Sequence, residues 1–127
     1  MSTRIHADAA KNTLYLILDG FFGEGEIKNA VAMTYTEVKK LRAGFSVIND
    51  LTGFRPTDPK AGDSIKAAQT DLVKLGMKRV VRVVGQNVLG ELQFSLRGKQ
   101  VGYEGNLKVE TAGSVADAEK LLSAAGG

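Results

Sequence analysis

The stretch TLYLILDGFF (13–22) decides the fold, because it is rich in β-forming residues and nearly every one of them is apolar. A strand with one wet face alternates apolar and polar residues, whereas a strand covered on both faces reads as a continuous apolar run. The segment therefore predicts a central strand with a layer of structure on each side of the sheet.

The segments on either side of this strand predict a hairpin and a helix. RIHADA (4–9) predicts a short strand, and Lys11 and Asn12 supply turn-forming residues between the two strands. On the other side, GEGE ends the strand, and residues 26–42 carry apolar side chains at helical spacing. Acidic residues precede this helix and basic residues close it, which complements the helix dipole.

The rest of the chain alternates between predicted strands and helices. The predicted strands are 45–50, 78–85 and 107–110, and the predicted helices are 63–76, 87–100 and 114–125. Alternating strands and helices imply parallel pairing with right-handed crossovers. The sequence thus predicts a single α/β domain over residues 1–127. Its sheet is mostly parallel with four to five strands, an N-terminal hairpin and about four helices.

Composition excludes several classes of function. The 127-residue chain has no cysteine, which rules out disulfides, thiolate metal sites and cysteine catalysis. The net charge of +3 is scattered and aromatic residues make up 6% of the chain, so no nucleic-acid partner is predicted. No apolar run is long enough to cross a bilayer and no signal sequence opens the chain, so we expect a cytoplasmic protein without membrane insertion.

The segment DLTGFRPTDPKAGDS (50–64) is the main candidate for chemistry, because it follows a predicted strand and leads into a helix. Ligands of open α/β sheets bind at such strand ends. Asp50, Asp58 and Asp63, together with Asp19, could hold Mg²⁺. Aspartate is also favoured at turns and helix caps for local hydrogen bonding alone, with Asp63 or Ser64 as the expected cap. The turn interpretation is favoured, and no catalytic residue, metal ligand or cofactor is predicted.

Three further features carry alternative interpretations. His6 has no serine nucleophile elbow to serve, so an exposed strand histidine is expected. Arg82 interrupts an apolar strand and is expected to reach solvent, with a buried ion pair or anion binding as the alternatives. Phenylalanines lie near predicted strand ends and either fill the core or line an apolar pocket. The residues of that possible ligand pocket are Phe21, Phe22, Phe54 and Arg82.

The ordered set of segments resembles the STAS domain family, also called SpoIIAA-like, whose members include anti-sigma-factor antagonists. The resemblance rests on LYLILDGFF followed by a helix, on VINDLTGF, on KLGMKRVVRVVG and on VETAGSVADAEKLL. It covers nearly the whole chain and implies a regulatory domain that acts by protein–protein contact. The implied contact surface is residues 53–62 with the first turn of the following helix. Its residues are Thr57, Asp58, Lys60 and Ser64.

The resemblance also implies a phosphorylation switch, and here the sequence departs from the family pattern. Antagonists of this family are reversibly phosphorylated on a serine or threonine that follows an aspartate at the start of the second helix. Placing Asp58 on that aspartate puts Pro59 on the acceptor position, and proline has no hydroxyl. We therefore expect a non-enzymatic interaction domain without the usual phosphoacceptor. The alternative is a SpoIIAA-like protein that binds a small apolar or anionic ligand.

Overall fold

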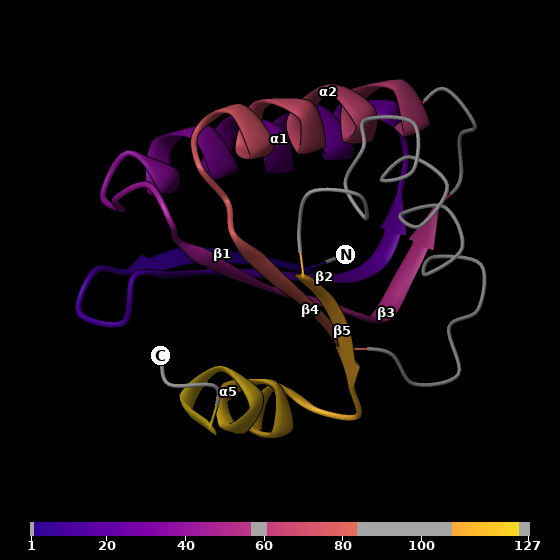
Figure 1. Ribbon diagram of the computed structural model, residues 1–127. Helices are drawn as coiled ribbons and strands as arrows, with labels where there is room; N and C mark the ends of the chain where they lie inside the picture. The colour runs from indigo at the N-terminus through magenta and orange to yellow at the C-terminus, as the bar shows by residue number, and fades with distance from the viewer. Residues whose placement is uncertain (1, 57–60, 84–107, 125–127) are drawn as a thin grey trace.

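One mixed β-sheet with helices on both faces forms the body of the protein (Figure 1). The computed structural model describes residues 2–56, 61–83 and 108–124. The strands of the sheet lie side by side in the order of the chain. They are β1 (Ser2–Asp8), β2 (Thr13–Phe22), β3 (Ser46–Pro56), β4 (Arg79–Val83) and β5 (Lys108–Ala112). β1 and β2 form an antiparallel hairpin, and the three pairings that follow are parallel.

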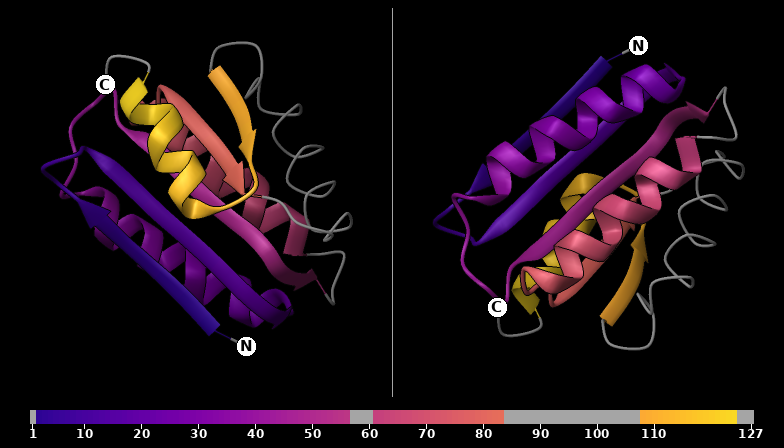
Figure 2. Two further views of the ribbon diagram at one scale, coloured as in Figure 1. Left: turned by 90° about the horizontal axis from the view of Figure 1, so that it is seen from below. Right: turned by 90° about the horizontal axis from the view of Figure 1, so that it is seen from above.

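Two helices cover one face of the sheet and a third helix covers part of the other. α1 (Glu24–Val38) and α2 (Ala61–Lys74) lie together on the first face, and α5 (Val115–Ala124) lies on the second (Figures 1 and 2). α5 packs against β3, β4 and β5 and leaves β1 uncovered by any described helix on that face. The predicted α/β class and N-terminal hairpin are confirmed. The predicted helix over 87–100 lies outside the described residues.

Each face of the sheet has its own hydrophobic core, because neighbouring residues of a strand point to opposite faces. Leu14, Val47 and Val80 belong to the larger core beneath α1 and α2. Ile48 and Val81 belong to the smaller core beneath α5. The central strands are covered on both sides, which explains their nearly continuous apolar sequences. None of the helices in the described ranges is long and apolar enough to cross a membrane.

α1 begins and ends earlier than its sequence pattern predicts. The backbone N–H of Gly23 donates to Glu26 Oε1 at 2.8 Å, and the helix begins at Glu24 rather than at residue 26. A glutamate three residues into a helix commonly closes its N-terminus in this way. At the other end, Lys39 is the C-cap, so the apolar spacing that extends to Leu41 continues beyond the helix.

The largest departure from the sequence prediction is the length of β3, which runs to Pro56 instead of ending at residue 50. Its second half pairs with the second half of β2, after an irregularity in register that follows the Ile17–Asp50 pair. Residues 51–56 are therefore strand, although their composition is typical of a turn. α2 then begins at Ala61, which places Ser64 inside the first turn of the helix and not at its cap.

Candidate functional site

Aromatic side chains lie on both faces of the sheet where β2 and β3 end. Phe22 and Phe54 are fully buried with their ring centroids 5.5 Å apart, and both belong to the core beneath α1 and α2. Phe21 points to the other face and is 70% exposed. Its register partner across β3 is Arg55, which is also exposed. An aromatic and a guanidinium side chain thus stand next to each other in solvent.

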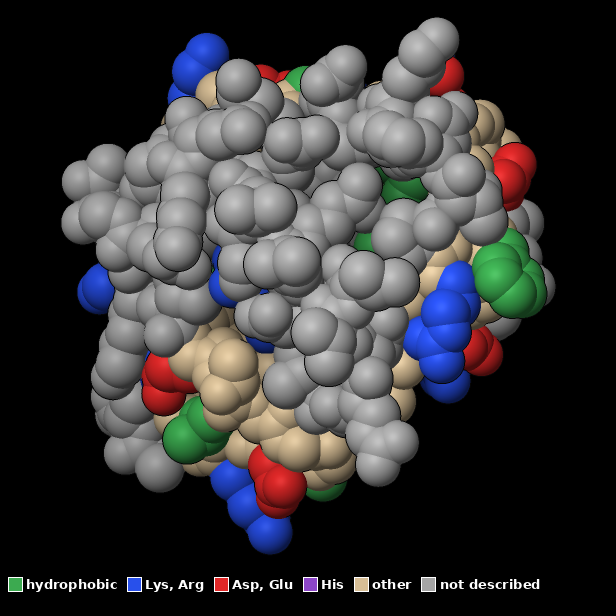
Figure 3. Space-filling model, turned by 90° about the vertical axis from the view of Figure 1, so that its right-hand side faces the viewer, with side chains coloured by type: hydrophobic (Ala, Val, Ile, Leu, Met, Phe, Trp, Pro, Cys, Tyr) green, Lys and Arg blue, Asp and Glu red, His purple; other side chains and the backbone are tan. Residues whose placement is uncertain are grey.

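Figure 3 views the molecule from the side at which β2 and β3 end. At one border of this view a hydrophobic side chain lies beside Lys or Arg side chains. Large exposed apolar side chains beside arginine are typical anchor groups of protein interfaces. We refer to Phe21 and Arg55 as the strand-end pair.

Two of the predicted pocket residues are placed otherwise than the sequence suggested. Phe21 and Phe22 are neighbours in a strand and point to opposite faces, so they cannot line one pocket. Arg82 was expected in solvent but is only 2% exposed. It shares the face of Val80, beneath α1 and α2, and its register partner in β3 is Asn49. β4 is a short strand between β3 and β5, so the guanidinium of Arg82 cannot reach solvent at an edge of the sheet.

The predicted partner-binding residues fall mostly beyond the described ranges. Thr57, Asp58 and Lys60 lie outside the described residues, as does Pro59. Ser64 lies in the first turn of α2 and is partly exposed. Arg55 of the strand-end pair precedes this segment along β3, so this residue and the predicted loop are close in the chain.

Asp19 and Asp50 are the described aspartates of the candidate metal site, and each has a contact of its own. Asp50 Oδ1 accepts the backbone N–H of Thr52 at 3.0 Å, which is the turn-type bond that favours aspartate at such positions. The Asp19 carboxylate lies across Gly53 of β3, where a Cβ would come within 1.8 Å of Asp19 Oδ1. Within the ranges 2–56, 61–83 and 108–124, no group of three or more acidic or histidine side chains is arranged to hold a metal ion.

A second polar cluster joins the sheet to α5. The Tyr15 hydroxyl donates to Glu119 Oε2 at 2.7 Å, and Lys11 Nζ lies 3.2 Å from the same oxygen. His6 is exposed on β1, and its ring stacks on Tyr15 with centroids 4.6 Å apart. Burial and the Glu119 carboxylate raise the pKa of Tyr15. The Tyr15 hydroxyl and Lys11 in turn lower the pKa of Glu119. The contacts anchor α5, and each group has a structural partner.

The chain was compared with family models and with curated proteins. No family model matches it. No curated protein matches it either. The contacts and burial of its own side chains therefore carry the argument about function.

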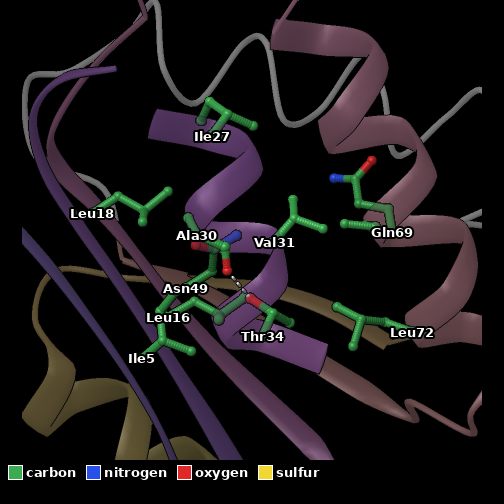
Figure 4. A pocket seen from close by; sticks show the side chains of 11 residues that line it. Ile5, Leu16, Leu18, Ile27, Ala30, Val31, Thr34, Asn49, Gln69 and Leu72 are labelled. Atoms are coloured by element: carbon green, nitrogen blue, oxygen red, sulfur yellow. Dashed lines mark hydrogen bonds between the residues drawn. The ribbon is translucent and has the colours of Figure 1, made fainter. Parts of the chain in front are cut away.

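A cavity lies between the sheet and the two helices of the first face (Figure 4). Its volume is about 50 Å³, and most of its wall is aliphatic. Asn49 forms part of the floor, is 3% exposed, and its Oδ1 has no hydrogen-bond partner in the described part of the protein. The wall residues are Ile5, Leu16, Leu18, Ile27, Ala30, Val31, Thr34, Asn49, Ala68, Gln69 and Leu72.

Sequence reasoning did not single out this cavity, although one signal pointed to it. Asn49 is an amide inside the otherwise apolar strand FSVIND, on the face that the register assigns to the main core. A buried amide in a central strand normally needs a hydrogen-bond partner. The absence of a partner could not be read from the sequence, because it depends on how α1 and α2 pack above the strand.

Proposed function

We propose that the protein is a non-enzymatic regulatory domain of the STAS, or SpoIIAA-like, type and that it acts by binding another protein in the cytoplasm. The observation that carries the proposal is the strand-end pair, an exposed phenylalanine beside an exposed arginine at the carboxyl ends of the central strands. Such a pair gains little from lying in water and gains much when a partner covers it.

The position of the pair agrees with the surface that the family resemblance implies. That surface consists of residues 53–62 and the first turn of α2. Phe54 and Arg55 open this stretch, and Ser64 lies in the helical turn that closes it. Pro59 on the acceptor position favours a constitutive interaction over a phosphorylation switch. An N-terminal hairpin at the edge of the sheet of an α/β domain also supports the proposal.

The test is a quantitative comparison of bound proteins on immobilised wild type and variants. Phe21→Ser removes the apolar anchor, and the double variant Asp58→Ala with Lys60→Ala alters the adjoining loop. Met33→Ser is the matched control, because Met33 is another exposed apolar side chain on the outer side of α1. We expect one set of proteins to be recovered by wild type and by Met33→Ser, and to fall at least about tenfold with Phe21→Ser.

The outcome that contradicts the proposal is equally specific. If the same proteins bind to wild type and to both strand-end and loop variants, the interaction surface lies elsewhere. The circular dichroism spectrum and melting temperature of each variant are measured alongside. Phe21 is mostly in solvent, so its replacement is expected to leave both unchanged.

A further inference from the structure

A groove lies at the end of the molecule where α1 and α2 both end, opposite to the strand-end pair (Figure 1). Phe45 lines this groove just before β3 begins, and Arg55 lies near the end of the same strand. At about 3.3 Å per strand residue, the two sites are about 30 Å apart. The groove is lined by Tyr35, Val38, Lys39, Leu41, Phe45 and Leu75. We refer to it as the helix-end groove.

The helix-end groove has an apolar floor and an exposed apolar wall. Val38 and Phe45 are buried members of the larger core. Leu75, by contrast, is 49% exposed. The groove has a volume of about 350 Å³, and a cavity of about 150 Å³ already holds benzene, so a large apolar side chain fits. A half-exposed leucine beside such a hollow gains stability when another molecule covers both.

The two turns that follow α1 and α2 hold the groove in place. The backbone N–H of Gly44 donates to the oxygen of Gly76 at 2.7 Å, and the N–H of Lys78 donates to the oxygen of Phe45 at 2.9 Å. A Cβ built on Gly76 would lie 2.8 Å from the Cβ of Ala43, so the turns are in close contact. The groove is therefore formed before anything binds, which lowers the cost of binding.

Basic side chains gather around the groove. The segments 37–45 and 71–78 contain five basic and two acidic residues, a net charge of +3 that equals the charge of the whole chain. The fold thus brings together an excess of charge that is scattered in the sequence. The basic residues are Lys39, Lys40, Arg42, Lys74 and Lys78, and all of them are exposed.

Most of these cations have no acidic partner in the described part of the chain. Lys40 Nζ lies 2.8 Å from Glu37 Oε2, and the other four form no ion pair with any described residue. The second acidic residue, Asp71, accepts the hydroxyl of Tyr35. An apolar hollow is therefore bordered by positive charge that is free to meet carboxylates.

We propose that the helix-end groove binds an acidic segment of a partner protein, with one large apolar side chain of that segment in the groove and its carboxylates against the surrounding cations. The hollow selects the anchor side chain, and the cations select the charge around it. A flat membrane surface fits less well, because a hollow needs a protruding group to fill it. A symmetric pair of grooves is disfavoured, because it would bring like charges together.

The experiment is a titration of the whole protein with blocked five-residue peptides, followed by NMR of the methyl groups that line the groove. The first peptide carries one phenylalanine between two pairs of glutamates, and we expect it to shift the methyl signals of Leu41 and Leu75. Alanine in place of the phenylalanine should weaken binding at least about tenfold. Lysines in place of the glutamates should abolish it. Raising the salt from about 0.05 M to about 0.5 M should weaken it, because salt screens exposed charges.

Variants with matched controls place the peptide in the groove. Lys39→Glu should weaken binding about tenfold, whereas Lys120→Glu makes the same change of charge on the exposed side of α5 and should have no effect. Leu75→Ser removes the exposed wall and should weaken binding, whereas Met33→Ser should not. If Leu75→Ser does not fold, Lys39→Glu still tests the groove. Phe21→Ser should bind the peptide like wild type, so this proposal and the proposed function can fail separately.

Several results would overturn the proposal. It fails if the alanine or lysine peptide binds as well as the first peptide, or if well-folded Lys39→Glu binds like wild type. Binding to vesicles of phosphatidylserine and phosphatidylcholine that is lost in Lys39→Glu, with no response to the peptide, would assign the surface to a membrane instead. Groove signals that shift with the concentration of the protein alone would assign it to a second copy of the chain.

Discussion

Gly53 of β3 lies directly against the side chain of Asp19 in the neighbouring strand β2. The Asp19 side chain occupies the space above it, and a Cβ built on Gly53 would lie 1.8 Å from Asp19 Oδ1 and 2.7 Å from Asp19 Cγ. The backbone of Gly53 itself is not in the left-handed region, so alanine is forbidden there by its neighbour and not by its own dihedral angles. The two residues therefore form a coupled pair.

Replacing Gly53 by alanine is expected to lower the free energy of unfolding by about 1–2 kcal/mol, because the aspartate must leave its place. In an Asp19→Ala background the same change should cost nothing, or should stabilise by about 0.5 kcal/mol, since glycine is unfavourable within a strand. Urea denaturation of the four proteins of this double-mutant cycle measures the coupling. Equal effects in both backgrounds would show that the two side chains do not compete for this space.

In addition to the hydrophobic cores, tyrosine hydroxyls link α1 to α2 and β2 to α5. Tyr35 of α1 donates to Asp71 Oδ2 of α2 at 2.5 Å, and Tyr15 of β2 donates to Glu119 of α5. α5 is further fixed at its start, where Ser114 Oγ accepts the backbone N–H of Asp117 at 3.1 Å. An N-cap of this kind stabilises a helix by about 1 kcal/mol.

The pair that links α1 and α2 predicts a pH dependence. The hydrogen bond to Asp71, together with burial, raises the pKa of Tyr35 to about 12 from the ordinary value of 10.0. A raised pKa means that the bond contributes its full stability below pH 10.0 and loses it as the pH rises toward 12. The titration of Tyr35 is obtained by subtracting the tyrosinate absorbance of Tyr35→Phe from that of the wild type. Its midpoint should lie near pH 12, and Asp71→Ala should move this midpoint toward pH 10.0. A midpoint near 10.0 in the wild type would contradict the bond.

The sequence predicts the elements better than it predicts their ends. The nearly apolar run 13–22 marks β2 correctly at both ends, and Asp19 is the one charged residue within it. The composition of residues 51–56 predicts a turn. The segment is nevertheless a strand, because it pairs with the second half of β2. Long-range pairing of this kind overrides local preference. Arg82 was misplaced for a related reason, since its burial depends on both neighbouring strands and on the helices above.

The candidate sites were less predictable than the fold. Phe21 was singled out, but its exposure follows only once the register assigns Phe22 to the core. The cavity depends on the distance between two helices, and no local pattern in the sequence encodes it. Asn49 was not among the predicted residues for that reason.

At the scale of the whole molecule, the sheet must protect its outer strand from pairing with another copy. β1 is the first strand of the sheet, and the backbone N–H of Ala7 donates to Glu37 Oε1 of α1 at 3.0 Å. Bonds to Lys40 and to this N–H lower the pKa of Glu37 below its ordinary value of 4.5. The carboxylate therefore remains charged in mild acid and keeps part of the strand edge occupied. Covering an edge in this way opposes edge-to-edge association.

Glu37→Ala is expected to promote self-association, because it frees an edge N–H to pair with a second chain. Sedimentation velocity over a range of concentrations should show a dimer for Glu37→Ala that is absent from the wild type at pH 7. Glu37→Gln keeps a neutral acceptor and should remain monomeric like the wild type. Lys40→Ala removes the neighbouring cation alone and serves as the control for charge. Protonated Glu37 also keeps a neutral carbonyl acceptor, so the wild type should stay monomeric as the pH falls through the lowered pKa of Glu37.

Because the strands lie in the sheet in chain order, the sheet can form step by step while the protein is being synthesised. Each strand pairs with the one that precedes it in the chain, so no strand has to wait for a distant segment to be synthesised. Contacts close in sequence reduce the entropy lost in each closure and speed folding. On a ribosome, where chains emerge at about 5–20 residues per second, β1 and β2 can pair before β3 appears. Each later strand then adds to a template that already exists. We expect the sheet to grow in one direction during translation, with the N-terminal hairpin as its starting point.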